Sequence, residues 1–178
     1  MALRGNKVVK LTNVCKDFDT WPRVAVETGT FMGGTTEALA QMFEDVYTVE
    51  LSEKYHDETR QRIAGGNIRC LFGDTGDAVR FLSTAIREPV FWFLDAHSPY
   101  GWSEVIKRHL PTTNPMPLWQ EIDHIMARPY VDVIVVDDVH CFGGPHGWED
   151  VTIENLTKRC NAAKTRLFHD SFAMLRVP

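Results

Sequence analysis

The chain lacks the features that would assign it to several large protein classes. Its 178 residues carry a formal net charge of −5, and no run of lysines and arginines interrupts the sequence. Proteins that bind duplex DNA need such cations to replace counterions along the phosphates. No apolar run approaches the roughly 18 residues that would span a bilayer. We therefore expect neither a nucleic acid nor a membrane as partner, and a small-molecule substrate is the better default.

Cysteine is scarce, and its spacing matches no zinc signature. The four cysteines, Cys15, Cys70, Cys141 and Cys160, form no CxxC pair. We expect reduced thiols, with Cys70 in a strand and Cys160 on a helix, because a free thiol packs as a small hydrophobe. The N-terminal stretch MALRGNKVVKLTNVC lacks the apolar core of a signal peptide. These absences favour a cytoplasmic location.

The sequence does contain a regular alternation of strand-like and helix-like runs. Its length and ordinary composition, 44% hydrophobic and 24% charged, suggest one domain over residues 1–178. The strand-like runs cover residues 23–27, 46–51, 68–72, 90–95, 131–137, 165–169 and 172–177. Apolar residues recur at helical spacing over 78–86 and 118–126. The order predicts an α/β fold: a Rossmann-like, doubly wound, mostly parallel seven-stranded sheet.

Three segments depart from this alternation. The last two strand-like runs are separated only by Asp170 and Ser171, which predicts a C-terminal antiparallel hairpin. Residues 1–22 form an N-terminal extension, expected as a helix or a flap over one edge of the sheet. Residues 97–117 make a long, proline-rich connection after a central strand, and loops of this length in compact domains are commonly functional lids.

The stretch VAVETGTFMGG joins the first strand to the first predicted helix of the sheet. Glu27 stands at the tip of the strand, and Gly29 and Gly33 flank a nearly bare turn that includes Thr30. The spacing departs from the GxGxxG of dinucleotide-binding proteins, and a carboxylate here would repel a diphosphate. A ligand with an ammonium group and no phosphate, such as S-adenosylmethionine (SAM), fits better. The alternative is a structural turn in which Glu27 accepts backbone hydrogen bonds.

Acids also follow the next two strands. Glu50 ends the second strand, where a carboxylate can accept hydrogen bonds from both ribose hydroxyls. Gly73 after the third strand allows close approach, and Asp74 could receive the exocyclic amine of an adenine. Glu50 could instead be a solvated carboxylate, and Asp74 a helix N-cap, which is compatible with binding.

The blocks VETGTFMGG, YTVELSE, LFGDTGDA, FWFLDAH and VIVVDDVH together resemble the class I SAM-dependent methyltransferases, most closely the macrocin type that modifies sugars and related short methyltransferase-like proteins. The resemblance implies that Glu27, Gly29 and Thr30 hold the methionine part of SAM. It also implies that Glu50 holds the ribose and that Asp74 lies near the adenine. Gly33, Gly73 and Asp95 complete the predicted cofactor site.

A metal site is expected beside the cofactor. Asp95 ends the fourth strand, and Asp137 and Asp138 end the fifth, so three carboxylates should converge and repel one another unless a cation is present. Oxygen ligands suit Mg²⁺, and the resemblance implies a divalent ion at these positions. His97 is the first choice for a catalytic base and His140 the second. A site that used both histidines would favour Zn²⁺, Mn²⁺ or Fe²⁺.

The leading hypothesis is therefore a SAM-dependent O-methyltransferase, assisted by Mg²⁺, that acts on a hydroxylated small molecule such as a sugar. An NAD-dependent oxidoreductase is one alternative, disfavoured by Glu27 and by the missing glycine. A non-catalytic SAM-binding module is another, because the short chain offers little to cover an acceptor. A homodimer that closes the site with a partner subunit is plausible.

Overall fold

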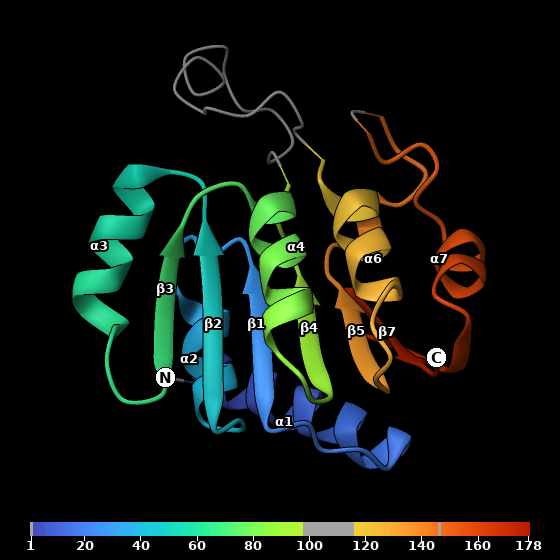
Figure 1. The fold of residues 1–178 in the computed structure, drawn as a ribbon, viewed down its shortest axis with the longest axis horizontal. Helices are drawn as coiled ribbons and strands as arrows, with labels where there is room; N and C mark the ends of the chain where they lie inside the picture. The colour runs from blue at the N-terminus through green and yellow to red at the C-terminus, as the bar shows by residue number, and fades with distance from the viewer. Residues whose placement is uncertain (1, 98–115, 146) are drawn as a thin grey trace.

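A computed structural model describes residues 2–97, 116–145 and 147–178 (Figure 1). Most of the predicted lid-like loop, residues 98–115, lies outside the described residues. Within the described part of the chain, no helix is long and apolar enough to cross a membrane. All four cysteines are free thiols, and Cys160 lies one residue past the end of its helix.

One seven-stranded sheet forms the centre of the molecule, as predicted, with strand order β3-β2-β1-β4-β5-β7-β6. The strands are β1 (Val24–Thr28), β2 (Asp45–Glu50), β3 (Ile68–Phe72), β4 (Val90–Leu94), β5 (Asp132–Val136), β6 (Ala162–Phe168) and β7 (Ser171–Arg176). β1 to β5 pair in parallel, whereas β7 runs antiparallel to both β5 and β6. Of the expected strands, β6 differs most because it begins three residues early.

Helices cover both faces of the sheet. They are α1 (Ala2–Phe18), α2 (Gly34–Ala40), α3 (Glu53–Ile63), α4 (Thr75–Ala85), α6 (Leu118–Met126) and α7 (Ile153–Arg159), with a short 3₁₀ turn η1 (Val139–Cys141) after β5. α4 and α6 pack side by side on one face, and α1 packs against α2 on the other (Figure 1). The N-terminal extension is thus a helix that covers a face of the sheet.

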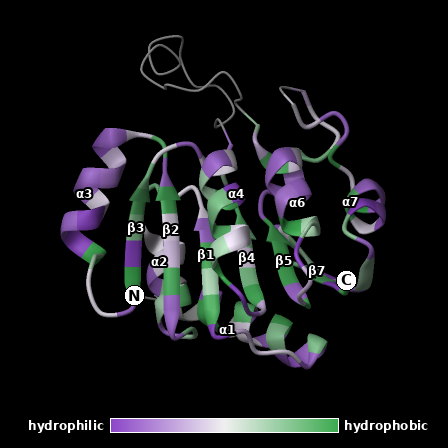
Figure 2. Cartoon of the chain, in the orientation of Figure 1, coloured by the Kyte–Doolittle hydropathy of each residue, from purple (hydrophilic) through white to green (hydrophobic). Residues whose placement is uncertain are grey.

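The strand side chains alternate between two apolar layers. Trp92 of β4 joins Leu82 and Ile122 in the layer under α4 and α6, whereas Phe91 and Phe93 join the layer under α1 and α2. Figure 2 shows the central strands as mostly hydrophobic, while α3 turns a hydrophilic surface outward. Burial of these large side chains on both faces accounts for the nearly unbroken apolar sequence of β4 and β5.

The apolar spacing over residues 78–86 placed two side chains on the wrong face, Phe81 and Ala85. Phe81 is 66% exposed, whereas Val79 and Leu82 are buried. α4 begins at Thr75, and Gly76 lets the α6 residue Gln120 approach closely.

Candidate cofactor and metal site

The predicted site residues gather at the carboxyl ends of the central strands β1 and β4. β1 and β4 are neighbours, and the connections that follow them lead to opposite faces. In open α/β sheets, ligands bind outside the carboxyl ends of the strands at such a switch point. Glu27 lies at the end of β1, and Asp95 follows β4 directly.

The glycine turn lies against the end of β4. Gly29 has φ +84°, and a Cβ at this position would lie 2.5 Å from the Asp95 carbonyl oxygen. Gly33 has φ +67°, and its Cβ would lie 2.8 Å from side-chain atoms of Thr59 and Ile63 in α3. Backbone N–H groups of Gly29 and Thr30 both donate to the Val49 carbonyl. Both glycines are therefore required by close packing and by left-handed backbone geometry.

Glu27 is buried and held by threonine hydroxyls. Thr36 and Thr48 donate to its Oε2 over 2.5 Å and 2.6 Å, and the Thr30 hydroxyl lies 2.6 Å from that of Thr48. Burial raises the pKa of Glu27 to about 8, although the two threonine hydrogen bonds oppose the shift. A carboxyl group in this state gains its charge most readily when a cation arrives beside it.

Glu50 and Asp74 shape the loops after β2 and β3. The two Glu50 oxygens accept backbone N–H groups of Phe31 and Ser52, each over 2.8 Å, which joins the glycine turn to the start of α3. Gly73, at φ +145°, donates its N–H to the Glu50 carbonyl. Asp74 caps α4 by accepting the Asp77 N–H over 3.2 Å. The N-cap alternative for Asp74 thus describes a real contact, whereas Glu50 is buried and hydrogen-bonded, so the alternative of a solvated carboxylate is wrong.

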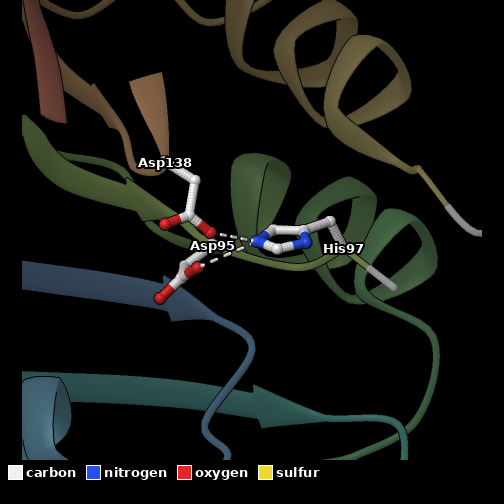
Figure 3. Close-up of side chains that lie close together, drawn as sticks. All are labelled: Asp95, His97 and Asp138. Atoms are coloured by element: carbon white, nitrogen blue, oxygen red, sulfur yellow. Dashed lines mark hydrogen bonds and ion pairs between the residues drawn. The ribbon is translucent and has the colours of Figure 1, made fainter. Parts of the chain in front are cut away.

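Asp95, His97 and Asp138 form a compact cluster between the ends of β4 and β5 (Figure 3). The Nε2 atom of His97 lies 2.5 Å from Asp138 Oδ2 and 3.5 Å from Asp95 Oδ1. Burial works against the imidazolium, but the two carboxylates outweigh it and raise the pKa of His97 to about 10. The hydrogen bond from His97 lowers the pKa of Asp138, whereas burial raises that of Asp95.

The other two predicted residues of the metal and acid–base site lie outside this cluster, although His140 Nδ1 is 3.8 Å from Asp138 Oδ1 and forms a second possible ligand group with Asp138 and Asp170. Asp137 accepts a hydrogen bond from Ser171 and lies 3.5 Å from the Nζ of Lys7 in α1. His140 is 65% exposed and contacts Asp170 through Nδ1 over 2.5 Å. Asp138 follows the end of β5 at Val136 with a left-handed backbone, φ +58°, and its carboxylate contacts His97, whereas that of Asp137 contacts Ser171 and Lys7. His97 takes the position in the cluster that we had assigned to Asp137.

Two charged residues near the site had no predicted role. Lys7 was part of an unassigned extension. Glu121 is 1% exposed, and its Oε2 accepts a hydrogen bond from Thr28 over 3.4 Å. Burial raises the pKa of Glu121 to about 7. With Asp95, His97 and Trp148, Glu121 lines a small pocket.

The cluster offers a mixed set of metal ligands. Two carboxylate oxygens and one imidazole nitrogen lie within 4.8 Å of one another. This set suits Mn²⁺, Fe²⁺ or Zn²⁺ better than Mg²⁺, which prefers oxygen ligands alone. The Nε2 atom of His97 lies within 3.5 Å of an oxygen of each carboxylate, so these three atoms could bind one cation together.

Comparisons with known proteins agree on the fold. Neither a protein-family model nor a curated protein matches the chain. Among solved structures, the O-methyltransferase of Bacillus cereus in complex with S-adenosylhomocysteine (SAH) has 22% identity and a TM-score of 0.57, covering 88% of this chain and 74% of that one.

Two further solved structures are similar at lower identity. TomG of Streptomyces achromogenes, an O-methyltransferase of tomaymycin synthesis in complex with SAM, has 16% identity and a TM-score of 0.53, covering 96% and 89% of the two chains. Human methyltransferase-like protein 13 in complex with SAH has 13% identity and a TM-score of 0.52, covering 88% and 72%. The chain therefore has the fold of the class I SAM-dependent methyltransferases, as its motifs predicted.

Proposed function

We propose that this protein transfers the methyl group of SAM to a hydroxyl group of a small molecule, and that a divalent metal ion assists. The observation that carries the proposal is the position of the cluster of Asp95, His97 and Asp138. It adjoins the glycine turn, because Gly29 packs directly on the Asp95 carbonyl. A cofactor on the turn and an acceptor on the cluster would therefore be neighbours.

The residues of the turn would hold the cofactor. Glu27 would receive the α-ammonium group of SAM, and Glu50 the ribose hydroxyls. Glu50 already accepts two backbone N–H groups, but each carboxylate oxygen has two lone pairs and retains one for a ribose hydroxyl. Asp74 would lie near the adenine while it caps α4.

The cluster would bind and orient the acceptor. Asp95 and Asp138 would be metal ligands, and His97 would be a third because its Nε2 already faces both carboxylates. When bound, a divalent ion lowers the pKa of a coordinated hydroxyl group. In the reaction the acceptor oxygen loses its proton to solvent, forms the bond to the methyl carbon, and the carbon–sulfur bond breaks to release SAH. A hydroxylated acceptor such as a sugar matches this arrangement.

Methyl transfer can be tested with the purified protein. SAH formation is measured by mass spectrometry with SAM and a panel of sugars and catechols, in the presence of Mn²⁺, Mg²⁺ or EDTA. We expect metal-dependent turnover. Replacing Asp138 by Asn should lower it at least about 100-fold and change SAH affinity less than threefold, because the ion and the cofactor have separate ligands. Asp150→Asn, at an exposed position, is the matched control.

Three results would argue against this function. Turnover that EDTA leaves unchanged would remove the metal from the proposal. SAH binding without transfer to any acceptor would favour a SAM-binding module. Tight binding of NADH in place of SAH would favour the oxidoreductase alternative.

A further inference from the structure

The N-terminal helix places one cation among the acids at the carboxyl end of the sheet. Lys7 extends from α1 across the ring of Phe93 in β4, with Nζ 4.7 Å from the ring centroid. Its Nζ lies 2.6 Å from the hydroxyl of Thr35 in the first turn of α2, and 3.5 Å from Asp137 Oδ2 after β5. The side chain is 33% exposed, so solvent and solutes can reach it.

Lys7 also lies near Glu27. Thr35, which contacts Lys7, is followed directly by Thr36, which donates to the Glu27 carboxyl. The charge of Lys7 acts on Glu27 through space and lowers its pKa, against the larger effect of burial. An acid and a base thus lie on either side of one pair of threonines at the start of α2.

This pairing matches an α-amino acid. The methionine part of SAM carries an ammonium group and a carboxylate on the same carbon atom. If Glu27 receives the ammonium group, the carboxylate must lie within a few ångströms of it. Glu27, Asp95, Asp137 and Asp138 would repel a carboxylate there. An ammonium group with three donors, one of which is donated to Thr35 while Asp137 lies 3.5 Å away, would bind it.

We propose that Lys7 binds the carboxylate of the methionine part of SAM, so that the N-terminal helix belongs to the cofactor site. This inference rests on the proposed function, because it requires SAM or SAH to occupy the switch point. Lys7 would bind the carboxylate, and Glu27 the ammonium group, of the same amino-acid part of the cofactor. The contact is made equally to SAM and to SAH, since both retain the carboxylate.

Calorimetric titration with three ligands distinguishes the contributions of the carboxylate and the ammonium group to binding. SAH carries both charged groups, S-adenosyl-3-thiopropylamine lacks the carboxylate but keeps the ammonium group, and 5′-methylthioadenosine lacks both. Lys7→Met preserves the apolar stem over Phe93 and removes the charge. We expect it to weaken SAH binding about tenfold, the loss of one charge-assisted hydrogen bond at a partly exposed site. Binding of the other two ligands should be unchanged.

Two further variants complete the experiment. Lys7→Arg should keep most of the SAH affinity, because it restores a cation. Lys16→Met makes the same chemical change at an exposed position of the same helix and should have no effect. Unchanged binding of 5′-methylthioadenosine to Lys7→Met also shows that this variant is folded.

Different failures separate the two proposals. If wild-type protein binds neither SAH nor 5′-methylthioadenosine, the proposed function is wrong and the inference fails with it. If SAH binds and Lys7→Met does not weaken it, the inference alone is wrong. An equal loss for all three ligands would also overturn it, because Lys7 would then support the fold and not contact the carboxylate.

Discussion

The two ends of the sheet both bury acids but satisfy them in different ways. At the amino end, Asp132 of β5 is fully buried and accepts hydrogen bonds from Arg128 Nε and from the Val90 N–H, each over 2.8 Å. Arg128 also donates through Nη1 and Nη2 to the carbonyl groups of Ser83, Ile86 and Glu88. This network joins α4, α6 and two strands through an arginine whose charge is permanent.

At the carboxyl end, the acids are held by groups that a ligand could replace or supplement. Glu27 depends on threonine hydroxyls, and Asp138 on His97, whose proton a metal ion can displace. Asp137 contacts Lys7 at 3.5 Å, which is longer than an ordinary hydrogen bond. Asp132 at a strand beginning is thus held by a fixed arginine network, whereas the acids at strand ends, which we propose to bind the cofactor and metal, are held by more replaceable groups.

Removing the buried contact between Asp132 and Arg128 at the amino end should have the largest effect, and that effect should be on stability alone. Asp132→Ala leaves the buried Arg128 without its carboxylate, which typically costs about 3–5 kcal/mol. Urea unfolding measures the loss, and SAH affinity of the folded fraction should stay within about threefold. Asp123→Ala removes the carboxylate from the exposed pair with Arg159 and should cost less than about 1 kcal/mol. Equal costs for the two variants would refute the comparison.

At the carboxyl end, His97→Ala should instead affect turnover more than stability. It removes the residue that neutralises Asp138, and with it one proposed metal ligand, so turnover should fall about 100-fold. The free energy of unfolding should also fall, but by less than the about 3–5 kcal/mol expected of Asp132→Ala, because His97 is 15% exposed whereas Asp132 is fully buried. His124→Ala is a histidine control on α6. A larger loss of turnover from His140→Ala would show that His140, and not His97, completes the metal site with Asp138.

Much of the fold could be predicted because it depends on local patterns. Apolar runs with intervening helical spacing identified all seven strands, and the short Asp170–Ser171 connection identified the hairpin. Convergence of Asp95 and Asp138 also followed from the sequence, because the ends of adjacent parallel strands meet at one edge. These parts of the site are set by topology, which the alternation of elements determines.

The other parts of the site depend on side-chain direction and on distant segments. Adjacent acids at 137 and 138 could not be assigned to faces without the left-handed turn at Asp138, with φ +58°. Lys7 reaches the site from a helix whose position no local pattern specifies. Glu121 did leave a signal. The apolar spacing of Leu118, Ile122 and Ile125 omits one position on the buried face, and that position is Glu121.

The protonation of Glu27 should make the free energy of unfolding depend on pH. A folded-state pKa near 8 exceeds the unfolded value of 4.5, so the folded protein holds a proton that the unfolded chain releases. This stabilisation is complete below pH 4.5 and is lost as pH rises to about 8. Glu27→Gln should therefore gain stability relative to wild type between pH 6.5 and 8.5, on the order of 2 kcal/mol. Urea unfolding at both pH values measures it.

An exposed acid provides the control for this measurement. Glu58→Gln, on the outer surface of α3, should show no such change with pH. A difference between wild type and Glu27→Gln that is constant across the range would mean that Glu27 is already ionised in the folded protein. The buried carboxyl would then resemble Asp132, and the distinction between the two ends would weaken.

The smallest expected effect concerns the glycine turn. In Gly29→Ala, the new Cβ would lie 2.5 Å from the Asp95 carbonyl oxygen, so the turn must move away from the end of β4. We expect SAH affinity to fall about tenfold, in line with the strain of a crowded left-handed residue. Gly66→Ala is a close control, because Gly66 also has positive φ, +57°, but its Cβ would meet open space. If both variants bind SAH equally well, the close approach of the turn to β4 does not position the cofactor, and the carboxyl end loses its assigned role.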